Sequence, residues 1–151
     1  MNDNNYRATI EVVKSPEDVF EIITSDVSKW WGGKDLKGNT TNEGDEFIVF
    51  HPGAHYSKQK LIEVIYQSKV VWLVTESTLE WIEKDKSEWT NTKMIFELTP
   101  NGDTTVLSFT HEGLVPEKEC YQRVGQDWTI VIKQWLFNYI SSGKVPDQLY
   151  H

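Results

Sequence analysis

Hydrophobic and polar residues alternate at the start of the chain. Between residues 6 and 13 the apolar side chains fall on every second position, which is the pattern of a strand with one face in water. The run Ser15-Pro16-Glu17-Asp18 then predicts the start of a helix, because serine caps a helix, proline suits its first position and acids favour the positive end of its dipole. A second short helix is expected over residues 26–31, where Gly32-Gly33 ends it.

The middle of the chain has the pattern of strands. The expected strands cover residues 46–51, 56–66, 70–77, 93–99 and 104–111. Pro100-Asn101-Gly102-Asp103 separates the last two and predicts a hairpin turn. Residues 80–91 are mostly polar, and we expect them to form an exposed excursion between strands.

A long helix is predicted from about Cys120 to Ser142, with Gly143 closing it. Its apolar residues fall on one stripe at helical spacing: Val124, Trp128, Val131, Ile132, Trp135 and Tyr139. The sheet has no other large partner for its apolar face. The pattern therefore predicts one α+β domain over residues 1–151, a curved antiparallel sheet of about six strands wrapped around this helix, with a cavity between them.

Composition narrows the classes of function. The 151 residues include 15 Lys and Arg against 23 Asp and Glu, a net charge of −8, which disfavours nucleic-acid binding. No apolar run approaches the length of a membrane span, and the first residues lack the pattern of a secretory signal. A lone Cys120 forms no internal disulfide. We expect a cytoplasmic protein that has no membrane span and no nucleic acid among its partners.

Several short motifs, in order along residues 6–146, resemble the SRPBCC (START-like, helix-grip) superfamily. They are the helix start at residues 15–20, Trp30-Trp31 followed by residues 44–47, the strand end at residues 110–114, and Trp128, Leu136, Tyr139 and Gly143-Lys144 in the last helix. The similarity is to the branch named for the activator of the heat-shock protein 90 ATPase. It implies the helix-grip fold, and roles in transport, catalysis or chaperone action.

Aromatic side chains supply the candidate ligand site. Trp72, Phe96, Phe109, Trp128 and Trp135 are on segments that should meet inside the protein. As core residues they need no further explanation, which is the more common case, and as walls of a cavity they would suit a flat, apolar ligand.

The remaining cavity candidates are two aromatic residues and two polar ones. Trp30 and Trp31 are expected near the mouth of the cavity. His111 shares a strand face with Phe109 and should point toward the helix, where it or Tyr139 could orient a ligand. His111 is also consistent with a hydrogen-bonded core histidine.

Other reactive residues give weaker signals. His51 and His55 have metal-ligand spacing and could use Glu46 as a third ligand, but Pro52-Gly53 between them favours a solvated turn. Cys120 is interpreted as a buried or inert thiol. The sequence predicts no catalytic residue, no metal site and no cofactor, because phosphate-binding, nucleophile and zinc motifs are absent from it.

Ile130 and Phe137 lie one heptad apart on the outer side of the predicted helix. They suggest a homodimer contact, or a surface covered by another part of the chain. Three functions remain open: binding of a hydrophobic small molecule, a chaperone-related interaction domain, and a cyclase-, dehydratase- or hydrolase-like enzyme that uses the same cavity.

Overall fold

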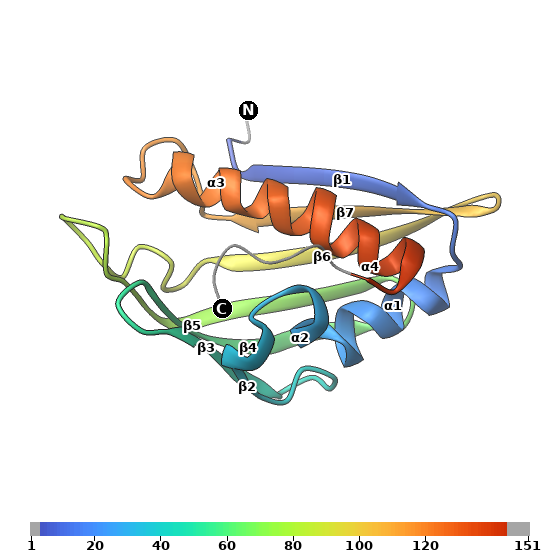
Figure 1. The fold of residues 1–151 in the computed structure, drawn as a ribbon, viewed down its shortest axis with the longest axis horizontal. Helices are drawn as coiled ribbons and strands as arrows, with labels where there is room; N and C mark the ends of the chain where they lie inside the picture. Colours follow the sequence, from blue (N-terminus) through green and yellow to red (C-terminus); the bar gives the residue numbers. More distant parts are fainter. Residues whose placement is uncertain (1–3, 145–151) are drawn as a thin grey trace.

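Seven antiparallel strands form one sheet that curves around a long C-terminal helix in the computed structural model, which describes residues 4–144 (Figure 1). The strand order is β1-β7-β6-β5-β4-β3-β2. The strands are β1 (Tyr6–Val12), β2 (Leu36–Gly38), β3 (Glu46–His51), β4 (His55–Ile65), β5 (Lys69–Leu79), β6 (Lys93–Asn101) and β7 (Thr104–Glu112). Residues 1–3 and 145–151, the two ends of the expected domain, lie outside the described residues.

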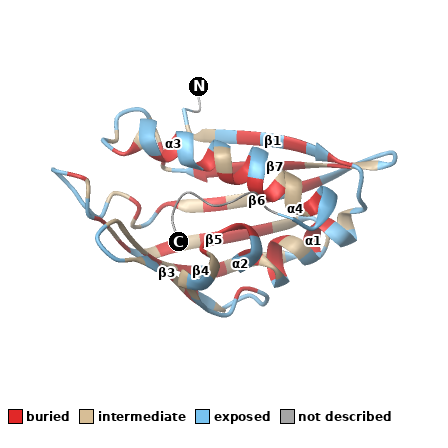
Figure 2. Ribbon diagram, viewed as in Figure 1, coloured by how far each residue is buried: buried red, intermediate tan, exposed pale blue. Residues whose placement is uncertain are grey.

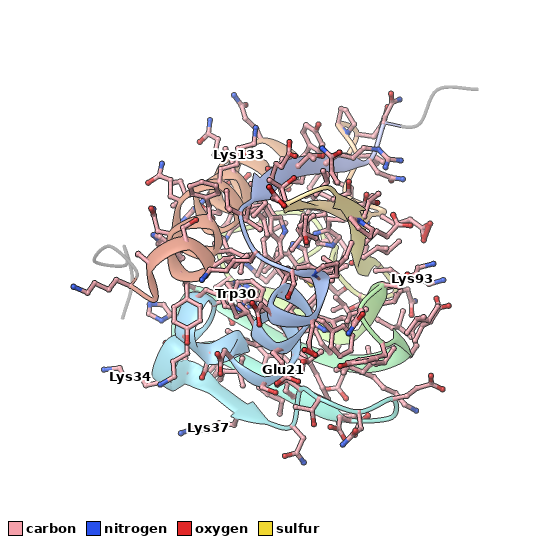
Figure 3. The ribbon with its side chains drawn as sticks, turned by 90° about the vertical axis from the view of Figure 1, so that its right-hand side faces the viewer. Glu21, Trp30, Lys34, Lys37, Lys93 and Lys133 are labelled. Carbon is pink, nitrogen blue, oxygen red and sulfur yellow. The ribbon has the colours of Figure 1, made fainter. Side chains whose placement is uncertain are left out.

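Two short helices follow β1, as predicted. They are α1 (Pro16–Ser25) and α2 (Val27–Trp30), and a 3₁₀ turn, η1 (Gly33–Asp35), leads into β2. The Ser15 hydroxyl accepts a hydrogen bond from the Asp18 backbone N–H at 3.1 Å, so the predicted cap is present. In Figure 3, Trp30 lies in the interior at the end of α2, whereas Lys34 and Lys37 point outward.

The long helix is continuous but not uniform. It consists of α3 (Tyr121–Ile130), a π-helical segment η2 (Val131–Leu136) and α4 (Phe137–Ser142). A π turn takes one residue more than an α turn, so the buried face moves by one position beyond it. Ile140 is buried for this reason, and Tyr139, which ideal helical spacing places on the apolar stripe, is half-buried and bonds Asp26 at 3.0 Å.

Two expectations about the sheet need correction. The sheet has seven strands rather than six, because the three-residue strand β2 is too short to show an alternating pattern. The segment 80–91 is not exposed throughout, since Ile82 and Trp89 are buried. These apolar side chains enter the core, while the charged residues between them stay in water.

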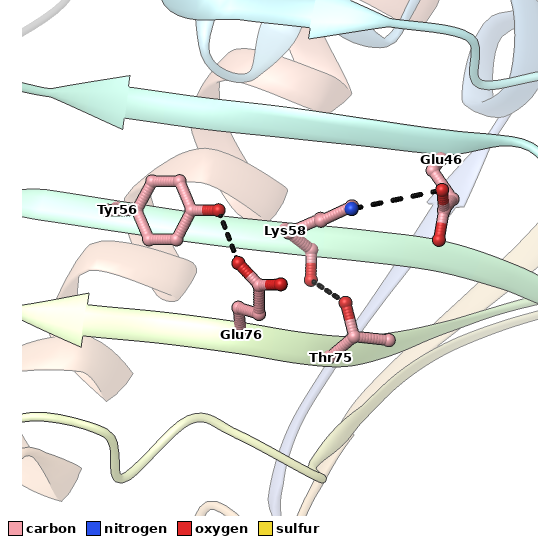
Figure 4. A network of polar contacts seen from close by, with 5 residues as sticks. All are labelled: Glu46, Tyr56, Lys58, Thr75 and Glu76. Carbon is pink, nitrogen blue, oxygen red and sulfur yellow. Dashed lines mark hydrogen bonds and ion pairs between the residues drawn. The ribbon is translucent and has the colours of Figure 1, made fainter.

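The two faces of the sheet differ sharply. The inner face packs against the helices and is apolar, and buried positions alternate with exposed ones along the strands (Figure 2). The outer face carries polar contacts (Figure 4): the Tyr56 hydroxyl donates to Glu76 at 2.7 Å, and Lys58 lies 3.9 Å from Glu46. In the described residues no helix is long and apolar enough to cross a membrane.

Candidate functional site

A pocket of about 430 Å³ is lined by residues of the start of α3, the β3–β4 turn and the segment 80–91. These three elements lie at the left in Figure 1. Four of the seven tryptophans line it: Trp31, Trp81, Trp89 and Trp128. Its other apolar residues are Val49, Ala54, Leu79, Val124 and Val131, and its polar residues are Asp35, His51, His55, Arg123 and Asp127. The pocket therefore offers an aromatic wall with a polar margin.

Ring contacts join three of these tryptophans into one wall. The Trp89 and Trp128 rings are nearly parallel, with centroids 6.2 Å apart, and Trp31 lies 5.2 Å from Trp128. His55 meets Trp89 edge-on at 4.8 Å. Trp31, Trp89 and Trp128 are each buried by at least nine-tenths, so the wall is held by packing on its far side.

A chain of buried hydrogen bonds fixes this wall from behind. The Trp128 indole N–H donates to His111 Nδ1 at 3.0 Å, and His111 Nε2 lies 2.8 Å from the Thr92 hydroxyl. That hydroxyl donates to the backbone oxygen of Trp89 at 2.5 Å, so its single proton is used there. His111 must then carry its proton on Nε2 and remain neutral. Burial agrees, because it lowers the pKa of His111 to about 3.

Polar groups at the β3–β4 turn form the sheet side of the pocket. His51 and His55 face each other across the turn, and His51 Nδ1 lies 2.9 Å from an Asp35 carboxylate oxygen. His55 Nε2 lies 2.7 Å from the Ser57 hydroxyl. Burial, with His51 nearby, lowers the pKa of His55 to about 4, so His55 is neutral at pH 7.

Within the described residues, His51 and His55 are not part of any group of three potential metal ligands. No cluster of three or more metal-ligating residues occurs within residues 4–144. Glu46, the third ligand considered from the sequence, pairs with Lys58 on the outer face of the sheet instead. His51 and His55 are therefore pocket-lining residues on a turn.

The helix side of the pocket carries a cation and a carboxylate. The Arg123 guanidinium lies over the Trp81 ring, 4.4 Å from its centroid, which is the geometry of a cation–π contact. Burial raises the pKa of Asp127, one turn further along the helix, and Arg123 opposes this shift. Arg123 and Asp127 give a ligand both a donor and an acceptor at the pocket margin.

Segment 80–91 is clamped to the start of the long helix. The Glu88 carboxylate accepts from the backbone N–H groups of Glu119 and Cys120, both at 3.0 Å. In return, the Glu119 carboxylate accepts from the N–H groups of Glu83 and Lys84 at 3.1 and 3.2 Å. This reciprocal capping holds the two tryptophans of the segment against the pocket.

The same clamp determines the state of the cysteine. Cys120 is buried, and burial together with the Glu88 carboxylate raises its pKa to about 12. The thiol is protonated at pH 7, as expected of an inert cysteine.

The nine candidate residues from the sequence occupy three places. Trp31 and Trp128 line the pocket. Tyr139 lies on the far part of the long helix, bonded to Asp26. The remaining six are buried in the core: Trp30, Trp72, Phe96, Phe109, His111 and Trp135. His111 points toward the helix as predicted, but it lies behind the wall and not among the lining residues.

Sequence reasoning missed most of the polar margin and two of the four pocket tryptophans. Trp81 and Trp89 lie in a segment interpreted as exposed, although two tryptophans in a polar stretch are a signal of a buried contact. The His51 and His55 pair was interpreted as a solvated turn. Arg123 and Asp127 lie one helical turn apart, and no pattern distinguishes such a pair from a solvated helix face.

Ile130 and Phe137 are both half-buried and pack against the core. Part of each side chain remains accessible on the long helix.

The fold is that of a helix-grip protein, and it contains a pocket lined by aromatic side chains. The family model described as "Activator of Hsp90 ATPase homolog 1-like protein" matches residues 14–136, and the chain belongs to this family. No curated protein matches the chain.

Solved structures share the fold at low sequence identity. The solution structure of the Aha1 dimer from Colwellia psychrerythraea is 21% identical, with a TM-score of 0.73 over 93% of this chain and 98% of that one. An HSP90 activator from Plasmodium falciparum is 18% identical, with a TM-score of 0.59 over 89% and 92%. DynU16, from the dynemicin biosynthetic locus, is 16% identical, with a TM-score of 0.69 over 95% of this chain and 49% of its own length.

Proposed function

We propose that this protein binds a flat, apolar small molecule in the pocket between α3, the β3–β4 turn and the segment 80–91. The observation that carries the proposal is the group of four tryptophans around one pocket. Indole rings give large apolar contact area, and polar groups at the margin fix the orientation of a ligand. A volume of about 430 Å³ is in the usual range for drug-sized ligands.

Binding is proposed in preference to catalysis because of the state of His111. Both ring nitrogens of this residue are engaged with Trp128 and Thr92 behind the wall. A catalytic base needs a nitrogen within reach of the substrate.

The test is a titration with 8-anilinonaphthalene-1-sulfonate, an apolar fluorescent probe with a negative charge that Arg123 can meet. Ala54→Phe places a ring in the pocket, and Pro52→Phe adds the same ring to the exposed side of the same turn. We expect Ala54→Phe to weaken probe binding at least about ten-fold and Pro52→Phe to leave it unchanged. Equal binding by both variants would place the probe elsewhere and contradict the proposal.

A chaperone-related role is the second candidate, and family membership favours it. The name of the family refers to activation of the Hsp90 ATPase, and the Plasmodium falciparum relative is described as an HSP90 activator. A pull-down at low salt with purified Hsp90 tests this role, and absence of binding there counts against it.

The cytoplasmic location stays a prediction.

A homodimer through Ile130 and Phe137 is proposed as the assembly. Support comes from the Colwellia psychrerythraea relative, whose solution structure is a dimer. The two side chains are only half-buried and lie seven residues apart on one helix.

A further inference from the structure

Gln59 is a polar residue without polar contacts in the core. Its side chain is fully buried, and neither atom of its amide has a hydrogen-bond partner among the described residues. The indole N–H of Trp72, also fully buried, likewise has none. Buried polar groups in proteins are almost always paired, so these two core residues, on adjacent strands of one sheet, need an explanation.

The strand register places Gln59 behind the pocket, on the same face of the sheet. His55 lines the pocket, and Ser57 and Gln59 follow it at alternate positions along β4. Gln59 lies opposite Phe47 on β3, and the next inward residue, Leu61, lies opposite Trp72 on β5. Gln59 and Trp72 therefore occupy neighbouring rows of the inner face.

The Trp31 ring contacts side chains both at the pocket and in these inner rows of the sheet. Its centroid lies 6.4 Å from that of His55 at the pocket and 5.8 Å from that of Trp72 in the core. It also lies 6.4 Å from the centroid of Phe47, the residue opposite Gln59. Trp31 thus spans the rows between His55 and Trp72 and lines the pocket itself.

We infer that the Gln59 amide and the Trp72 indole N–H form the inner polar end of the ligand site, which opens when the Trp31 ring turns aside. An amide offers one acceptor and two donor hydrogens, and the indole adds a third donor. The complementary group on a ligand both accepts and donates, as a carboxamide does. The inferred ligand is an aromatic molecule with a carboxamide-type group, and this inference rests on the proposed binding function.

An unpaired buried amide lowers the stability of the free protein, because its hydrogen bonds to water are lost on folding. Residues that lower stability without a structural benefit are typical of functional sites. A ligand carboxamide would supply the missing partners. Replacing Gln59 with an apolar residue should therefore raise the stability of the free protein and lower its preference for ligands with a carboxamide. Replacement of a residue with a purely structural role would not give both effects.

The experiment compares naphthalene with 2-naphthamide, which share a ring system and differ in the carboxamide. Equilibrium dialysis measures their binding to the wild type, to Gln59→Leu and to Leu61→Met, a control at the next inward position. We expect the wild type and the control to bind 2-naphthamide at least about ten-fold more tightly than naphthalene. In Gln59→Leu the two affinities should become equal, and the melting temperature of the free protein should rise.

The outcomes distinguish a failure of the proposed binding function from a failure of the inferred inner polar end. If neither compound binds the wild type, the proposed binding function fails. If both bind it with equal affinity, or if Gln59→Leu keeps the preference, only the inner polar end is overturned. Gln59→Met, an unbranched side chain of similar length, replaces Gln59→Leu if that variant does not fold.

Discussion

At the scale of single residues, His111 connects two tryptophans of the pocket from behind. It links the Trp128 indole to the Thr92 hydroxyl and, through that hydroxyl, to the backbone of Trp89. The chain is satisfied only by neutral imidazole with its proton on Nε2, because a second ring N–H would face the indole N–H. The histidine thus holds two tryptophans of the pocket wall in place without lining the pocket.

The neutral state of two histidines predicts a specific dependence of stability on pH. The pKa in the folded state is about 3 for His111 and about 4 for His55, both lowered from 6.5. The unfolded chain therefore binds protons first as the pH falls. The contribution of the two neutral histidines to the free energy of unfolding is fully present above pH 6.5. Below that pH it falls by about 1.4 kcal/mol per pH unit for each histidine.

Urea unfolding of the wild type and His111→Leu at pH 7, 6 and 5 measures this effect. We expect the variant to be less stable at pH 7 by about 1–3 kcal/mol, since the Trp128 and Thr92 groups lose their partner. The difference in free energy of unfolding between the wild type and the variant should become smaller as the pH falls, by about 1.4 kcal/mol per pH unit. His55→Gln should show the same narrowing, and a deficit that stays constant from pH 7 to pH 5 would contradict the neutral, buried state.

At the scale of elements, patterns that repeat along the chain were predictable and local irregularities were not. The pattern of apolar and polar residues identified six of the seven strands, and turn residues identified the last hairpin. Strand β2 has three residues, which is too few for a period. The π segment interrupts helical spacing at Val131–Leu136, so a stripe computed with uniform spacing misplaced Tyr139.

Residues of the candidate site were predictable only where they lie on a regular helix or strand. Trp128 lies on the apolar stripe of the long helix, and the stripe indicated its direction. Trp89 reaches the pocket from an irregular segment whose path depends on the Glu88 contacts with the helix start. Such contacts between residues 31 and 32 positions apart leave no periodic signal in the sequence.

The outer face of the long helix gives a prediction about assembly. Phe137→Glu places a charge on the proposed dimer contact, where desolvating it is unfavourable. In sedimentation experiments we expect a wild-type dimer and at least about a ten-fold weaker dimer for Phe137→Glu. Lys37→Glu, on the exposed edge strand β2, is the charge-changing control and should sediment as the wild type does. A monomeric wild type at high micromolar concentration would contradict the proposed contact.

At the scale of the whole molecule, the sheet and the long helix bury an aromatic core and leave one end open as a pocket. The core and the pocket share a continuous set of rings, from Trp30 and Trp72 through Trp31 to Trp128. The seven tryptophans thus divide into four that line the pocket and three that lie behind or away from it. The four pocket indole N–H groups are therefore expected to respond to a ligand differently from the other three.

The most direct measurement is the NMR spectrum of the indole N–H groups in protein labelled at tryptophan, recorded during a titration with 8-anilinonaphthalene-1-sulfonate. Single Trp→Phe variants assign the signals. The signals of Trp31, Trp81, Trp89 and Trp128 should shift together with one saturation curve, and those of Trp30 and Trp135 should shift much less. Shifts confined to Trp30 and Trp135, or no saturable shift at the four pocket tryptophans, would contradict a binding site in this pocket.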